Sequence, residues 1–282
     1  MLAGRPSRTL LPPAIRRAAH QLLDTPLILN DPIAVGLVPE ADERSIQASL
    51  LDHQSQESVL LRSLFVLRNR FAEDRLEEAA ARGVEQYVMF GAGLDTFPWR
   101  QPDYARGMRI FAVEHVSSLV WTQAAFWERG LPKPANLTFV PLDLESDPVG
   151  ERLAAYGFEP RPTFCSMLGV TQYLERASVE VVLRFVASLG SGSEVVFSYV
   201  PRADELDGID RDITEASAAR VARFGEPWKT RFGADELRGL LLAANFSEVS
   251  HFTPEHARQR YFSGRADELR PAGCEQLIAA VV

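Results

Sequence analysis

The stretch from Val84 to Arg100, VEQYVMFGAGLDTFPWR, constrains the fold of this chain more than any other segment. Tyr87 to Phe90 is a short apolar run with polar residues before it and Gly91-Ala92-Gly93 after it. A short apolar run that ends in glycines is more typical of a buried strand than of a helix. The glycines permit a tight turn and let a ligand approach the main chain, because no Cβ stands in the way. We therefore predict a strand, a glycine turn and a helix start, an arrangement that holds nucleotide-like cofactors at the carboxyl edge of parallel sheets.

Further apolar runs follow this first strand, and helical patterns separate them. Strands and helices that alternate at this spacing predict a parallel sheet covered on both faces, and right-handed crossovers place the carboxyl ends of the strands at one edge. The predicted strands are 86–90, 108–114, 137–142, 163–168 and 195–200, with a late strand at 248–252. The predicted helices are 14–23, 57–82, 119–127, 148–156, 178–189, 204–224 and 234–244.

The N-terminal region gives weaker signals. Its prolines, including Pro12 and Pro13, predict an irregular segment up to residue 13. In the helix that follows, Arg16, Arg17 and His20 lie on a mixed face, and we expect solvent exposure for them.

The composition excludes several classes of protein. Of the 282 residues, 46% are apolar and 24% are charged, as in ordinary globular domains. The net charge of −8 argues against a broad nucleic-acid surface, which needs clustered basic residues. No apolar run is long enough to span a membrane, the N-terminus lacks the apolar core of a signal peptide, and two distant cysteines fit a reducing compartment. We expect a cytoplasmic protein without a metal site, because the five histidines lack the spacing of metal ligands.

Two acidic residues end later strands, at the edge where open α/β sheets bind ligands. Glu114 ends the second strand and can accept hydrogen bonds from a ribose diol, and Asp143 follows the third and can reach a purine amino group. Together with Gly91 and Gly93, these acids are compatible with two cofactors, a nicotinamide dinucleotide or S-adenosylmethionine. The run GAGLDT lacks the third glycine of the dinucleotide fingerprint, and Asp95 adds negative charge where a phosphate would lie. A zwitterionic methionine with a sulfonium suits this site better.

The run GAGLDTFPWR resembles the first motif of the S-adenosylmethionine-dependent methyltransferases of the leucine carboxyl methyltransferase type, in particular their bacterial branch. The resemblance covers nearly the whole chain, and its combination of motifs is specific. It extends to SRT (7–9), RAAHQLLD with NDP (17–32), RNRFAED (68–74), FVPLDLE (139–145), LGVTQYL (168–174), GSEVVFSYV (192–200), GEPW (225–228) and RYFSGRADELRP (260–271).

This resemblance implies a class I methyltransferase fold, a Rossmann-like and mostly parallel sheet, as one domain over residues 1–282. The N-terminal helices within 1–83 and an insertion at 201–230 would form a helical cap. The implied cofactor is S-adenosylmethionine, with the glycine turn beside its methionine part and Glu114 at its ribose. Asp143 and the amide of Leu144 would hold its adenine.

The resemblance also implies an arginine that pairs with the cofactor carboxylate, a role that suits a guanidinium fork. Arg68 and Arg70 are the candidates, with Arg70 preferred, and Arg17 is a weaker one. The full set of predicted cofactor-binding residues is Arg68, Arg70, Gly91, Ala92, Gly93, Asp95, Glu114, His115, Asp143, Leu144 and Leu168.

The expected reaction is methyl transfer to a carboxylate or hydroxyl of a small molecule. We expect no nucleic-acid or membrane partner, and the sequence leaves open whether the enzyme forms a homodimer. A carboxylate is ionised at neutral pH and needs no base. Tyr173, just past the fourth strand, is the candidate catalytic residue that orients the acceptor, although a packed aromatic is an equal alternative. His115 would lie beside the ribose, or serve as the base for a phenol or alcohol. Trp228 and Tyr261 would line a lid.

Departures from the family pattern keep a second function open. Val116, Leu119 and Thr122 stand where relatives usually show a proline, a glutamine and a basic residue, and Leu168 stands where many show a glutamate. The alternative is a protein of the same fold that binds S-adenosylmethionine but no longer methylates, or that catalyses a different rearrangement of a natural product.

Overall fold

The computed structural model describes residues 7, 9–38, 47–48, 52, 54–267 and 269–282, and in this part of the chain seven strands form one sheet. Their order is β3-β2-β1-β4-β5-β7-β6, and β1 to β5 pair in parallel. The predicted mostly parallel α/β sheet is therefore confirmed. The strands are β1 Gln86–Phe90, β2 Arg109–Glu114, β3 Leu137–Pro141, β4 Phe164–Met167, β5 Glu194–Tyr199, β6 Glu248–Phe252 and β7 Gln276–Val281.

The strand β7 is absent from the sequence-based prediction. It lies between β5 and β6 and runs antiparallel to both, with Ile278 opposite Phe197 and His251. Its apolar residues are at the end of the chain, and they become a strand because the chain returns to the open edge of β5. This pairing is a tertiary effect that periodicity alone does not reveal.

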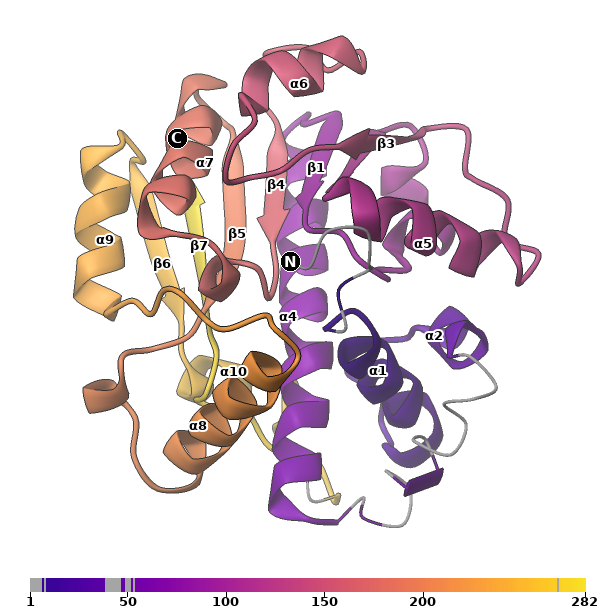
Figure 1. Ribbon diagram of the computed structural model, residues 1–282, viewed down its shortest axis with the longest axis vertical. Helices are drawn as coiled ribbons and strands as arrows, with labels where there is room; N and C mark the ends of the chain where they lie inside the picture. Colours follow the sequence, from indigo (N-terminus) through magenta and orange to yellow (C-terminus); the bar gives the residue numbers. More distant parts are fainter. Residues whose placement is uncertain (1–6, 8, 39–46, 49–51, 53, 268) are drawn as a thin grey trace.

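Helices cover both faces of the sheet (Figure 1). They are α4 Gln56–Ala81, α5 Val116–Trp127, α6 Val149–Ala155, α7 Arg176–Ser188, α8 Gly208–Arg223, α9 Ala234–Ala243 and α10 Pro254–Tyr261. α6, α7 and α9 pack on the face that carries Val88 and Phe90, whereas α4 and α10 pack on the face that carries Tyr87 and Met89. Because successive side chains of a strand point to opposite faces, β1 is apolar on both sides and buried along its whole length.

The helices α1 Leu11–Leu23 and α2 Pro32–Leu37 precede α4. The prediction of irregular backbone up to residue 13 is wrong at its end, because Pro12 and Pro13 lie in the first turn of α1. Proline is tolerated there, since the first amides of a helix have no intrahelical acceptor. Figure 1 shows α1 and α8 on opposite sides of the N-terminal half of α4, beyond the carboxyl ends of the strands.

The expected exposure of the α1 side chains is also wrong for two of them. Arg17 and His20 have exposed fractions of 4% and 0%. Arg17 donates through Nε to Asp31 at 3.1 Å and through Nη2 to the Leu94 carbonyl at 2.5 Å, and His20 Nδ1 lies 2.7 Å from the Asp24 carboxylate. Asp31 is the N-cap of α2 and Asp24 is the C-cap of α1. Leu94 lies in the loop after the glycine turn, so the bond from Arg17 ties α1 to the sheet edge.

Among the described residues, no helix combines the length and the apolar character that crossing a lipid bilayer requires.

Candidate active site

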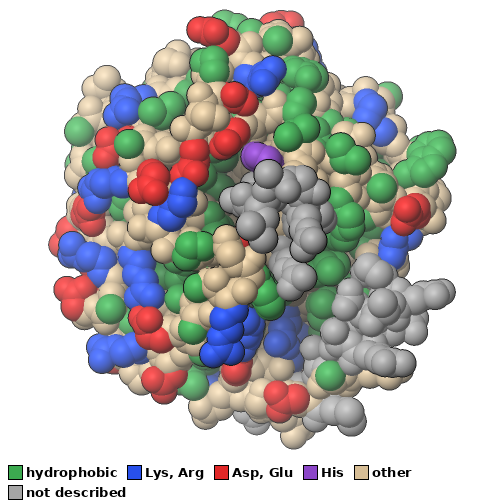
Figure 2. Space-filling view, in the orientation of Figure 1, with side chains coloured by type: hydrophobic (Ala, Val, Ile, Leu, Met, Phe, Trp, Pro, Cys, Tyr) green, Lys and Arg blue, Asp and Glu red, His purple; other side chains and the backbone are tan. Residues whose placement is uncertain are grey.

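A cavity of about 540 Å³ opens at the carboxyl edge of the sheet, where β1, β2, β3 and β4 end. Side chains of α1, α4, α8 and the loop at 224–229 complete its walls, and Figure 2 shows the hollowed face of the molecule. The cavity brings together most of the predicted site residues: Arg17, Arg68, Gly91, Ala92, Gly93, Asp95, Glu114, His115, Asp143, Leu144, Leu168 and Tyr173.

The glycine turn forms the floor of the cavity beside β1. Gly91 and Gly93 have φ values of 68° and 53°, in the left-handed region that favours glycine. A Cβ on Gly91 would lie 2.4 Å from Val170 Cγ2, so a side chain there would also collide with the loop after β4. The amides of Gly91 and Ala92 both donate to the Val113 carbonyl, at 2.9 and 3.1 Å, which fixes the turn against β2.

Glu114 links the ends of β1 and β2. Its carboxylate accepts hydrogen bonds from the amides of Gly93 and His115, both at 3.0 Å. Burial within the cavity walls raises the pKa of Glu114 to about 7, and these two hydrogen bonds act in the opposite direction. The carboxyl group therefore changes charge near neutral pH and presents an acceptor to the cavity.

Three further polar residues around Glu114 are held by local hydrogen bonds. His115 caps α5, with its Nδ1 2.8 Å from the Ser117 hydroxyl. Asp143 accepts from the Glu145 amide at 2.9 Å through one oxygen. Asp95 accepts from the Phe97 amide at 2.9 Å and from the side-chain amide of Asn69 at 2.7 Å, so its charge is engaged in positioning the loop.

Arg68 is the arginine of α4 that reaches the cavity. Its exposed fraction is 8%, its Nη1 lies 3.1 Å from the carboxylate of Glu275, and its guanidinium packs against Gly169, where a Cβ would lie 2.5 Å from Nη1. Its Nε is buried and has no hydrogen-bond partner among the residues that the structure describes. Arg68 and Glu275 therefore place a cation and an anion side by side at the end of β4.

The preference for Arg70 is corrected by the structure. Arg70 has a side chain that is 44% exposed, it pairs with Asp74 at 2.7 Å, and it is not among the residues that line the cavity. Residues two apart on a helix point to nearly opposite sides, so Arg68 and Arg70 cannot both face the sheet edge. Tyr261, expected in a lid, likewise lies elsewhere and donates to Asp74 at 2.6 Å.

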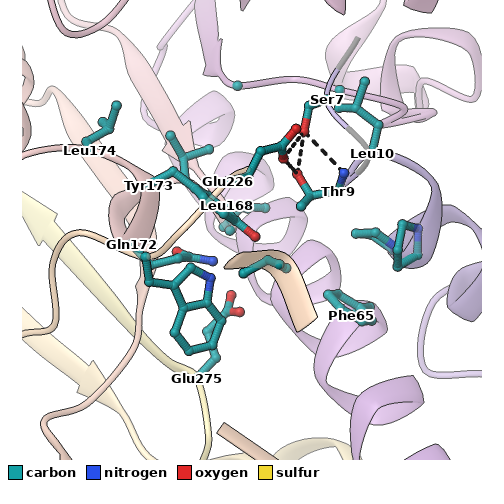
Figure 3. A pocket seen from close by; sticks show the side chains of 18 of the residues that line it. Ser7, Thr9, Leu10, Phe65, Leu168, Gln172, Tyr173, Leu174, Glu226 and Glu275 are labelled. Atoms are coloured by element: carbon teal, nitrogen blue, oxygen red, sulfur yellow. Dashed lines mark hydrogen bonds between the residues drawn. The ribbon is translucent and has the colours of Figure 1, made fainter. Parts of the chain in front are cut away.

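The loop after β4 carries two adjacent polar side chains into the cavity. Figure 3 shows Gln172 and Tyr173 on one side and Phe65 of α4 on the other. Burial raises the pKa of Tyr173, whose hydroxyl lies near Thr9 and Trp228, so Tyr173 stays neutral at physiological pH. Gln172 is only 5% exposed, and within the described part of the chain its buried Oε1 has no hydrogen-bond partner.

Sequence reasoning assigned no role to Gln172, Glu275 or Asn69, and it did not place Arg16, which is half-buried, at the cavity that it lines. A run such as LGVTQYL offers no signal that its glutamine is buried without a partner. Glu275 comes from the segment that leads into the unpredicted β7, so its position was not accessible from the sequence. In the described part of the chain, no three or more His, Cys, Asp or Glu residues are grouped so that they could hold a metal ion.

The fold and this edge together define the class of protein, a class I S-adenosylmethionine-dependent methyltransferase. Solved structures share the architecture. A DUF574 family protein from Streptomyces avermitilis has a TM-score of 0.58 at 18% identity, over 94% of this chain and 96% of that one. An inferred methyltransferase from Thermobifida fusca has a TM-score of 0.58 at 16% identity, over 99% of this chain and 96% of that one.

The family follows from sequence comparison. The family model described as leucine carboxyl methyltransferase matches residues 11–187, and the chain belongs to this family. YktD of Bacillus subtilis, an inferred S-adenosyl-L-methionine-dependent methyltransferase, is 28% identical over 290 residues, which cover 95% of each chain. The predicted family, fold, enzyme class and cofactor are thereby confirmed.

Proposed function

We propose that this enzyme transfers the methyl group of S-adenosylmethionine to an oxygen of a small molecule, and that the oxygen belongs to a carboxylate or hydroxyl group. The cofactor, when bound, supplies an electrophilic methyl group on a sulfonium. The residues of the chain then have to bind the two reactants, align them and exclude water.

The described residues fit this cofactor. We assign the glycine turn at 91–93 to its methionine part, Glu114 to its ribose hydroxyls, and Asp143 with Leu144 to its adenine. Arg68 would pair with the cofactor carboxylate, and Glu275 with the ammonium group, because a neighbouring cation and anion complement an amino-acid zwitterion. The unpartnered Nε of Arg68 supports this assignment, since buried donors normally find an acceptor.

One observation favours a carboxylate over a hydroxyl as the acceptor: the carboxylates of Glu226 and Glu145, which line the cavity, are already engaged. Glu226 accepts hydrogen bonds from the hydroxyls of Ser7 and Thr9, drawn as dashed lines in Figure 3, and Glu145 pairs with Lys229. The raised pKa of Tyr173 makes its hydroxyl a donor rather than a base. A carboxylate acceptor has a pKa near 4 and arrives as the anion, so it needs no base.

We infer that Tyr173 and Gln172 orient the acceptor. A tyrosine hydroxyl can donate a hydrogen bond, and a glutamine amide offers both a donor and an acceptor. An acceptor molecule that occupies this side of the cavity would satisfy the buried Oε1 of Gln172, which has no protein partner.

The purified enzyme tests this proposal in an assay of S-adenosylhomocysteine release. Paired acceptors separate the oxygens: 4-hydroxybenzoate carries both groups, and 4-hydroxybenzamide keeps only the hydroxyl. Mass spectrometry of the product then distinguishes a methyl ester from a methyl ether. Methylation of nitrogen or carbon in a wider panel of acids, phenols and amines would contradict the proposal, as would tight cofactor binding without turnover of any acceptor.

A further inference from the structure

The part of the cavity that α1, α4 and α8 line is called the channel below. Its lining combines apolar side chains with polar ones that include Thr214, Ser217 and Arg220. Figure 1 shows α1 and α8 on opposite sides of the N-terminal half of α4. The apolar lining residues of the channel are Leu61, Leu64, Phe65, Ile213, Val221 and Phe224. Such walls favour a ligand with an apolar body.

Arg16 of α1 lines this channel, and it differs from the neighbouring arginines in its partners. Its Nη1 donates to the Ser58 hydroxyl at 2.8 Å, and it forms no ion pair with any residue that the structure describes. Arg17 pairs with Asp31 at 3.1 Å, and Arg62 pairs with Asp24 at 2.8 Å. Burial, and then the nearby charge of Arg62, lower the pKa of Arg16.

Within the described part of the chain, the acids whose charges act on Arg16 are Glu57 and Asp52, and both are engaged with other partners. Glu57 pairs with Arg220 at 2.9 Å at the exposed rim, and Asp52 accepts from the Ser55 hydroxyl at 2.9 Å. A partly buried guanidinium without a counter-ion is unfavourable, and a bound anion would remove that cost. A guanidinium also matches the two oxygens of a carboxylate or phosphate.

The point at which Arg16 of α1 contacts α4 indicates how long a matching ligand is. Arg16 contacts α4 at Ser58, whereas Arg68 lies at the strand ends, ten positions further along the helix. At 1.5 Å per residue this separation is roughly 15 Å along the helix axis. A ligand that reaches both levels must be elongated.

We propose that Arg16 binds the anionic end of an elongated, mostly apolar methyl acceptor, whose reacting oxygen lies at the other end of the channel near Tyr173. This inference rests on the proposed function, and it names the class of acceptor: an amphipathic acid with its carboxylate or phosphate on the order of 10–15 Å from the oxygen that is methylated.

A pair of fluorescent probes tests the anion site in the enzyme saturated with S-adenosylhomocysteine. The probes are 8-anilinonaphthalene-1-sulfonate, which is anionic, and N-phenyl-1-naphthylamine, which has a similar apolar body without the sulfonate. We expect Arg16→Gln to weaken the anionic probe about tenfold or more, in line with hydrogen bonds to charged groups, and to leave the neutral probe unchanged. Arg16→Lys should restore most of the affinity, and Arg106→Gln, at a 74% exposed arginine, should match the wild type.

Three results would overturn the assignment of Arg16. The anionic probe could bind Arg16→Gln as tightly as the wild type, both probes could weaken equally, or the variant could lose affinity for S-adenosylhomocysteine, which would place Arg16 at the cofactor. If the wild type binds no S-adenosylhomocysteine, the proposed function fails, but titration of the two probes into the unliganded enzyme still decides whether Arg16 holds an anion.

Discussion

The two edges of the parallel sheet differ in how several of their buried polar side chains are hydrogen-bonded. At the amino edge, Glu194 at the start of β5 is fully buried and accepts hydrogen bonds from Arg75 Nε at 2.5 Å and Arg82 Nη2 at 2.6 Å. Nearby, the buried side chain of Gln86 donates to the Glu159 carbonyl at 2.7 Å. At the carboxyl edge, Gln172 Oε1 and Arg68 Nε are buried with no partner, and Arg16 has no counter-ion among the described residues.

The difference separates residues that stabilise the fold from residues that are available to a ligand. Both edges use side chains of α4, with Arg68 at the middle of the helix and Arg75 in its C-terminal third. Buried groups that lack partners are unfavourable in the empty enzyme, and those that line the cavity at the carboxyl edge lie where a bound molecule can satisfy them. Arg161 Nε, at the amino edge, also lacks a partner among the described residues, but it does not line the cavity. Substitutions at the amino edge should therefore change stability, and those at the carboxyl edge should change binding.

The largest effect is expected at the amino edge. Glu194→Ala should lower the free energy of unfolding by roughly 3–5 kcal/mol, because it leaves two arginines near the buried end of β5 without their common carboxylate. Urea denaturation measures this change. Glu159→Ala is the matched control: its pair with Arg109 involves a 62% exposed carboxylate, and its loss should cost less than about 1 kcal/mol. Equal effects of the two substitutions would contradict the distinction between the edges.

At the carboxyl edge, Glu114→Ala should weaken binding of S-adenosylhomocysteine by roughly 1.5–3 kcal/mol, the range for hydrogen bonds to a charged group. Isothermal titration calorimetry at pH 8 measures the affinity. Glu85→Ala, at a 67% exposed acid of the amino edge, should leave it unchanged. An unaltered affinity in Glu114→Ala would remove Glu114 from the ribose site.

The pKa of Glu114 near 7 predicts a pH dependence of cofactor affinity. The carboxyl group is neutral below its pKa and ionised above it, and ribose hydroxyls donate best to the ionised form. Affinity for S-adenosylhomocysteine should therefore fall as the pH falls, by about tenfold between pH 8 and pH 6 for a group that titrates near 7. Calorimetry across this range should show a flatter profile for Glu114→Gln, and identical profiles would rule out Glu114 as the titrating group.

The smallest expected effect has the opposite sign. Gln172→Met removes a buried acceptor that has no partner and keeps a side chain of similar length, so it should raise the free energy of unfolding by roughly 1 kcal/mol. The same variant should retain its affinity for S-adenosylhomocysteine but show a lower kcat/KM for the acceptor. Loss of stability in Gln172→Met would mean that the amide has a structural partner.

The sheet was predictable because its strands are short, apolar on both faces and bounded by glycine, proline or acidic residues. The predicted ends of the strands that became β1 and β2 fall within one residue of the observed ends. The helix α1 begins earlier than predicted because proline is compatible with a first turn. The strand β7 forms through pairing with distant strands, which no local pattern encodes.

The site residues also fall into two groups, those that the sequence revealed and those that only the structure identifies. The sequence revealed Gly93, Glu114 and Asp143 because they lie at or just after the ends of strands. The carboxyl ends of parallel strands meet at one edge of the sheet. The choice between Arg68 and Arg70 depends on the rotation of α4 about its axis, which the sequence pattern left undecided and the packing of the helix determines. Residues that act through missing partners need the complete set of neighbours, so only the assembled structure identifies them.

A crystal structure of the complex with S-adenosylhomocysteine tests the central claim most directly. The account predicts density in the cavity at the carboxyl edge, with the ribose hydroxyls within hydrogen-bond distance of Glu114, the adenine beside Asp143 and Leu144, and the amino-acid group at Arg68. Density for the ligand elsewhere on the molecule, or a ribose that makes no contact with Glu114, would contradict it.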